Sequence, residues 1–155
     1  MVELSRFLLS RAWVAVVGVA VLAGCGPVED TRPGKPVAHR QAAFKDILRS
    51  FEPMGLLLQK EKFDTKAFQA LAAELMTKRD APWGYFGADT QYPPSKSTPE
   101  VWTEKDKFEE SRKAFFQATD QLKLAADSGD QAAMAAAHKA VYDTCKQCHK
   151  KFKDK

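Results

Sequence analysis

The chain has 155 residues, of which 45% are hydrophobic and 28% are charged, and its formal net charge at pH 7 is +4. This length supports one domain with a modest hydrophobic core and leaves little room for a second. The positive charge is small and its residues are spread along the chain, so we expect no nucleic acid partner.

The first 24 residues have the pattern of an export signal. Arg6 and Arg11 flank an uncharged apolar run over residues 12–23. This run is too short to span a bilayer comfortably, but it suits the hydrophobic part of a signal peptide. We therefore expect residues 1–24 to be a leader that is removed from the mature chain.

The leader is followed by Cys25, and the sequence LAGC at residues 22–25 resembles the lipobox of bacterial lipoproteins. The resemblance implies that Cys25 is lipidated and holds a periplasm-facing protein to a membrane. The alternative is a signal peptide of the ordinary kind, in which Cys25 is a spare thiol. With Cys25 lipidated, export leaves Cys145 and Cys148 as a pair in an oxidising compartment.

The mature chain opens with residues 25–36, whose glycines, prolines and charges are typical of a flexible tether. Apolar residues then recur at helical spacing through residues 37–155. A first helix is predicted from about Val37 to Leu58, with Pro53 as the place where it could bend. A second helix is predicted to begin at Asp64 or Thr65.

Residues 80–99 contain four prolines and two glycines, which is typical of a long ordered connection. A third helix is predicted from about Pro99, and Gly129 and Asp130 are expected to stop it and to cap a fourth. No segment shows the period-two alternation of a strand. The sequence thus predicts an all-α fold, an antiparallel four-helix bundle over residues 37–155.

The fourth predicted helix carries a C-x-x-C-H motif, formed by Cys145, Cys148 and His149. Residues three and four apart on a helix are neighbours, so the two sulfur atoms and the imidazole can reach one flat ligand. Covalent haem attachment needs two thioether bonds and one axial nitrogen on the iron. The motif therefore predicts one haem c, bound through Cys145 and Cys148, with His149 as the metal ligand.

Two thiols at this spacing could serve three other purposes. A redox dithiol normally follows a strand in a thioredoxin-like unit, and this chain shows no strands. A structural zinc site needs a fourth ligand, for which only His39 and His138 remain as further histidines. A disulfide across one helical turn strains the helix and closes almost no loop. The haem interpretation is favoured over all three.

Residues 40–153 resemble the class II c-type cytochromes, the cytochrome c′ family. Besides the C-x-x-C-H motif, the matching features are Arg40 with Phe44 four residues later, PEVW at residues 99–102, Phe108, AADSGD at residues 125–130 and FK at residues 152–153. The resemblance implies a four-helix bundle with the haem on its last helix. Many family members pair, so it also leaves a homodimer open.

The same resemblance implies roles for single residues. It places Arg40 near a haem propionate, where the alternative is a solvated charge at a helix start. Family members usually have an arginine where this chain has Lys153, which keeps the charge but lacks the planar, bidentate guanidinium. Phe44 corresponds to the position that faces the distal side of the haem.

The distal residue decides the function that the resemblance implies. Methionine there implies a closed, six-coordinate electron carrier, whereas a bulky apolar residue such as Phe44 implies an open iron, because a phenyl ring cannot ligate it. His39, Met54, Met76 and Met134 are the side chains that could still supply a sixth ligand. We expect the methionines to be core residues instead.

These expectations describe a binding and redox protein, not an enzyme, because no acid or base is expected opposite Phe44. Nitric oxide or carbon monoxide would bind at the open iron, and a site without a hydrogen-bond donor disfavours oxygen. One electron would be exchanged with a redox partner protein. The alternatives are a dedicated six-coordinate electron carrier, a small peroxidase and a bundle without haem.

Overall fold

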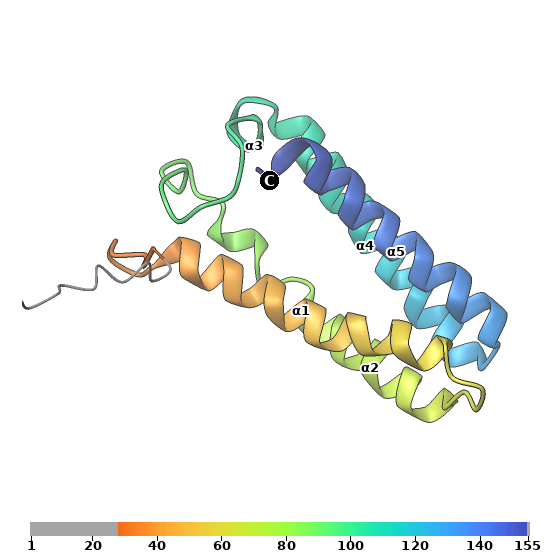
Figure 1. Ribbon diagram of the computed structural model, residues 1–155. Coiled ribbons are helices and arrows are strands. Elements are labelled where there is room, and N and C mark those ends of the chain that lie inside the picture. The colour runs from red at the N-terminus through yellow and green to blue at the C-terminus, as the bar shows by residue number, and fades with distance from the viewer. Residues whose placement is uncertain (1–27, 155) are drawn as a thin grey trace, which may run out of the picture.

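The structure is a computed structural model that describes residues 28–154, so the predicted leader and Cys25 lie outside the described residues. The described range holds the helices shown in Figure 1: α1 (Pro36–Leu58), α2 (Thr65–Lys78), the 3₁₀ turn η1 (Trp83–Tyr85), α3 (Glu100–Thr103), α4 (Lys105–Ser128) and α5 (Gln131–Phe152). Its only β pairing is an isolated bridge between Ser97 and Lys153. The all-α prediction is confirmed.

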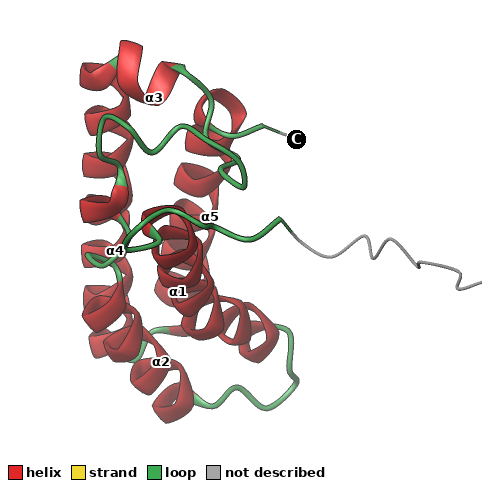
Figure 2. Cartoon of the chain, turned by 90° about the vertical axis from the view of Figure 1, so that its left-hand side faces the viewer, coloured by secondary structure: helices red, strands yellow, loops and turns green. Residues whose placement is uncertain are grey.

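The long helices form two antiparallel pairs, α1 with α2 and α4 with α5, and α2 packs along α4. The pairs converge at one end of the molecule and diverge at the other (Figure 1). The connection over residues 80–99 includes η1, and in Figure 2 its loop between η1 and α3 (green) lies at the diverging end. The predicted antiparallel four-helix bundle is thus confirmed. None of the helices in the described range has the length and apolarity needed to cross a membrane.

Helix ends follow the predicted capping residues. The Asp64 carboxylate accepts a hydrogen bond from the Ala67 amide at 2.9 Å at the start of α2. Gly129 ends α4 with φ 75°, a left-handed conformation that glycine adopts without steric cost. Asp130 then caps α5 by accepting from the Ala132 amide at 2.8 Å. These local signals turn the chain sharply between α4 and α5.

The third predicted helix is interrupted, which differs from the single helix expected. Glu104, at φ −118° and ψ 53°, separates α3 from α4. The turn has tertiary causes: Val101 is buried, and the Trp102 indole donates to the Gly87 carbonyl at 2.8 Å. Glu104 also forms an ion pair with Lys151 of α5. These contacts direct α3 away from the α4 axis and towards α5.

The predicted tether is shorter than expected, because Asp30 is already part of the folded domain. Its carboxylate is buried and accepts hydrogen bonds from the amides of Val37 (2.9 Å) and Ala38 (3.0 Å) and from the Tyr92 hydroxyl (2.9 Å). Asp30 therefore satisfies the free amides at the start of α1 and ties them to the connection. Composition predicted a loose segment, but one buried carboxylate orders it from residue 30.

The hydrophobic core fills the converging part of the bundle. All four long helices supply it, from the faces that the helical spacing predicted. Its fully buried members, each at most 1% exposed, include Met54, Phe68, Ala72, Leu75, Leu122, Ala126, Met134 and Val141. Helix α1 continues through Pro53 without a break.

His138 of α5 belongs to this core. Its ring stacks on Phe51 at 4.2 Å between centroids, and its Nε2 lies 3.3 Å from the Phe51 carbonyl oxygen. The absence of a side chain at Gly55 makes room for it, since a Cβ there would lie 3.1 Å from the imidazole. Burial lowers the pKa of His138, so the folded protein favours the neutral ring.

Acid should therefore weaken the fold partly through His138. The unfolded chain takes up a proton near the ordinary pKa of 6.5, whereas the folded chain takes it up only at lower pH. The stability contributed by the neutral ring is present above pH 6.5 and is lost as the pH falls through the lowered pKa. We expect His138→Phe to reduce the acid-dependent fall in the urea unfolding midpoint. The exposed His39 provides the control His39→Phe; equal acid slopes in wild type and His138→Phe would contradict the prediction.

Candidate functional site

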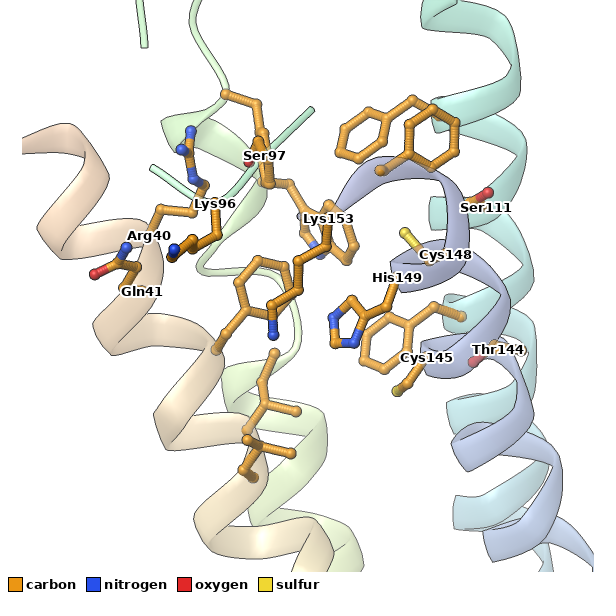
Figure 3. Close-up of a pocket in the computed structure, with 18 of the residues that line it drawn as sticks. Arg40, Gln41, Lys96, Ser97, Ser111, Thr144, Cys145, Cys148, His149 and Lys153 are labelled. Carbon is orange, nitrogen blue, oxygen red and sulfur yellow. The ribbon is translucent and has the colours of Figure 1, made fainter. Parts of the chain in front are cut away.

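A cavity of about 430 Å³ lies at the diverging end of the bundle. It is lined by α1, the connection, α4 and α5, and its walls are mainly apolar and aromatic (Figure 3). Its volume lies within the usual range for small-molecule and cofactor sites, about 300–1,000 Å³. Every described residue that the sequence assigned to the haem site lines this one cavity: Arg40, Phe44, Cys145, Cys148, His149 and Lys153.

Cys145 and Cys148 face the cavity from successive turns of α5 as free thiols. Burial raises the pKa of both, and that of Cys148 to about 11, with the neighbouring Cys145 adding to the shift. At neutral pH both groups are therefore protonated. A dithiol that works by thiolate attack needs a lowered pKa, which burial opposes here. Residues 28–154 also hold no cluster of three or more His, Cys, Asp or Glu side chains that could bind a metal ion.

His149 projects from α5 towards α1, with the two cysteine side chains on either side of it in the view of Figure 3. Partial burial lowers its pKa, and the charge of Lys153 lowers it further. The imidazole is thus favoured in the neutral form, whose free nitrogen lone pair is what a metal ligand requires. Lys153 follows the last turn of α5, where its amide donates to the His149 carbonyl at 3.3 Å.

Phe44 lies in the wall that α1 contributes. Its ring meets Trp83 edge-on, at 5.6 Å between centroids and 84° between planes, and Phe86 at 6.3 Å. Within the described chain, the lining of the cavity includes no methionine and no histidine besides His149. Met54 and Met134 are fully buried in the core, as expected, whereas Met76 is only half-buried and lies outside the core cluster.

Arg40 is buried, at 3% exposure, so the alternative of a solvated charge is wrong. Its guanidinium donates to the Tyr85 carbonyl (2.9 Å), to the hydroxyl and carbonyl of Thr90 (3.1 and 3.3 Å) and to the Ser95 hydroxyl (2.8 Å). It also lies 4.4 Å from the Phe86 ring centroid. Burial without an anionic partner in contact lowers the pKa of the guanidinium. Arg40 thus holds the connection over the cavity, and its contact with a haem propionate stays a prediction.

Sequence reasoning missed the part of the wall that the connection supplies. Trp83 and Phe86 line the cavity and pack with Phe108 of α4 at centroid distances of 6.1 and 4.9 Å. Lys96 and Ser97 line the same opening. The available signal was the sequence WGYF at residues 83–86, an unusual density of aromatic side chains for a loop.

The residues present fit a covalently attached haem. Two thiols and a neutral imidazole stand on one wall, and aromatic rings cover the others, which suits a flat, apolar macrocycle. Cationic side chains of Lys45, Lys96 and Lys153 border the opening, where the carboxylates of such a group would meet water.

Comparison with known proteins gives the same result. The family described as Cytochrome C' matches residues 35–153. Cytochrome c' of Rubrivivax gelatinosus is 32% identical over 126 residues, which cover 80% of this chain and 98% of the relative. Its crystal structure superposes with a TM-score of 0.75, covering 81% of this chain and all of that one.

Structures of cytochrome c prime from Alcaligenes xylosoxidans are also similar, at 29% identity over 82% of this chain with a TM-score of 0.74. They include a variant in complex with nitric oxide and a variant with bound carbon monoxide. The match covers the whole length of the nitric oxide-bound variant. Sequence and structure agree, and the chain belongs to the cytochrome c′ family, whose cofactor is covalently attached haem c.

Proposed function

We propose that this protein binds nitric oxide and carbon monoxide at the open distal side of one haem c and exchanges single electrons with a redox partner protein. The single observation that carries the proposal is the composition of the cavity. The attachment motif of α5 and the non-ligating Phe44 of α1 line the same cavity. Among the described residues, no methionine lines it, and His149 is its only histidine.

The attachment side is assigned to α5. Cys145 and Cys148 would form the two thioether bonds, and the neutral imidazole of His149 would ligate the iron. When bound, the haem supplies an iron that changes oxidation state by one electron and accepts a diatomic ligand. The α5 helix fixes the three attachment groups relative to one another, and the aromatic walls keep water away from the apolar face.

The opposite side is assigned to Phe44, which leaves the sixth position without a protein ligand. On the walls away from α5, neutral donors are already engaged: the Trp83 indole donates to the Arg79 carbonyl at 2.7 Å, and the Ser111 hydroxyl to the Lys107 carbonyl at 3.0 Å. Bound oxygen gains from a hydrogen-bond donor more than carbon monoxide or nitric oxide does, so this lining disfavours oxygen. The nitric oxide and carbon monoxide complexes of the Alcaligenes relative support the same ligand class.

The optical spectrum of the ferrous holoprotein tests the proposal. An open, high-spin haem gives a broad band that changes on adding carbon monoxide. The alternative function, a six-coordinate electron carrier, requires sharp, split bands that carbon monoxide leaves unchanged. The second result would retain the haem and remove the gas-binding function.

We also propose that the protein faces the periplasm and is anchored through lipid on Cys25. The support is the apolar leader and the lipobox-like sequence at residues 22–25. Full-length protein should partition into the detergent-rich phase of a Triton X-114 separation, and Cys25→Ser should move it to the aqueous phase. Equal partition of both proteins would remove the anchor and leave the haem proposal intact.

A further inference from the structure

Trp83 is fixed to the bundle by hydrogen bonds that do not involve the cavity. Its indole Nε1 donates to the carbonyl of Arg79, the residue after α2, at 2.7 Å. The Arg79 guanidinium in turn donates to the carbonyl of Phe116 (3.2 Å) and the hydroxyl of Thr119 (2.7 Å), and it pairs with Asp120. The indole is therefore tied to α2 directly and to α4 through Arg79.

The ring of Trp83 also packs against three aromatic rings of α4. It packs against Phe108 at 6.1 Å, Phe115 at 5.9 Å and Phe116 at 6.0 Å between centroids, all three from α4. A side chain held by a hydrogen bond and by neighbours on one rigid helix has little freedom to reorient. Trp83 is thus a stationary element in the wall of the cavity.

Phe44 has no polar atom that could fix its orientation. Its aromatic contacts within the described chain are Trp83 at 5.6 Å, in the favourable edge-to-face geometry, and Phe86 at 6.3 Å. Both rings are half-buried, and Phe86 also packs against Phe108 and lies 4.4 Å from the Arg40 guanidinium. Trp83 differs in having a side-chain hydrogen bond, to the Arg79 carbonyl, and in lying nearer to Phe44. The position of the Phe44 ring is therefore set mainly by Trp83.

We infer that Trp83 is a positioning residue, which holds the ring of Phe44 over the distal side of the haem and so limits the rate at which a diatomic ligand enters. The inference rests on the proposed function, in which Phe44 covers the open iron. Without the indole, space opens beside Phe44 and the ring can move back from the cavity. Ligand entry then becomes faster, although Trp83 itself supplies no group to the ligand.

The test is the carbon monoxide association rate of the ferrous holoprotein, measured for a double-mutant cycle. An edge-to-face pair of this kind contributes an energy that corresponds to roughly a threefold to tenfold change in rate. We expect Trp83→Leu to raise the rate by that factor in the wild-type background and to have no further effect in a Phe44→Ala background. Trp83→Phe keeps an aromatic edge but loses the donor to Arg79, and we expect an intermediate rate.

Trp102 provides the matched control. Its indole also donates to a backbone carbonyl, that of Gly87 at 2.8 Å, but no contact with Phe44 is present among the described rings. Trp102→Leu should leave the association rate unchanged. If Trp83→Leu fails to fold, the cycle is run with Trp83→Phe.

The outcomes separate the inference from the function beneath it. If Phe44→Ala accelerates binding but the Trp83 variants bind at the wild-type rate, or faster by the same factor in both backgrounds, the positioning role is wrong and the proposed function stands. If Phe44→Ala itself leaves the rate unchanged, Phe44 does not cover the iron and the positioning role fails with it. A ferrous wild type that binds no carbon monoxide at all would remove the proposed function. A slower rate in the Trp83 variants would overturn the inference as well.

Discussion

The double variant Cys145→Ala, Cys148→Ala should retain no covalently attached haem. Each thioether bond requires a cysteine sulfur, and Cys145 and Cys148 are the two thiols that line the cavity. Haem staining after denaturing electrophoresis should be absent from the double variant and present, at full intensity, in wild type.

The same variant should also be less stable, because a haem attached to these cysteines would fill the cavity, which the apoprotein must instead fill with water or close by collapse. Large deletions of buried groups cost about 2–5 kcal/mol, and we expect a loss of that order in urea unfolding. Ser111→Ala is the matched control, since Ser111 lines the same cavity from α4 without contributing a thiol. Covalent haem in the double variant would contradict the attachment assigned to this motif.

Replacing Phe44 by methionine should add a sixth ligand to the iron. The protein would then be a six-coordinate cytochrome without an open binding site. A thioether is an established axial ligand, and Phe44 lines the cavity from α1, where the proposed function assigns the sixth position of the iron. We expect the ferrous spectrum to become sharp and split. Carbon monoxide must then displace the thioether. An iron–thioether bond worth about 1.4 kcal/mol is enough to slow carbon monoxide binding roughly tenfold.

Phe51→Met is the matched control for this change. Phe51 lies seven residues further along α1 on a similar face of the helix, but it is buried in the core against His138 and does not line the cavity. The control should keep the broad ferrous spectrum of wild type. An unchanged spectrum in Phe44→Met would show that residue 44 does not reach the iron.

The helices and the attachment motif were predictable because they depend on residues close together in the sequence. Helical spacing identified all four long helices, and Asp64, Gly129 and Asp130 marked their ends correctly. The C-x-x-C-H motif places its three groups through the pitch of a single helix, so no tertiary information was needed to predict that they meet.

The features that were missed depend on contacts between distant residues. The helix break at Glu104 contains neither glycine nor proline. It is caused by the hydrogen bond from Trp102 to the Gly87 carbonyl and by the ion pair between Glu104 and Lys151. Asp30 is ordered by Tyr92, 62 residues away. The WGYF sequence marks an aromatic cluster, but its place in the cavity wall depends on the contacts of Trp83 with Arg79 after α2 and with Phe115 of α4, which no local pattern records.

The buried carboxylate of Asp30 limits how far the domain could travel from a membrane. If Cys25 carries the lipid, as proposed, only four residues separate it from this fixed point. At full extension, five residue steps reach about 17 Å. The cytochrome would then diffuse within a thin layer at the bilayer surface, and soluble electron donors would have to enter that layer to meet it.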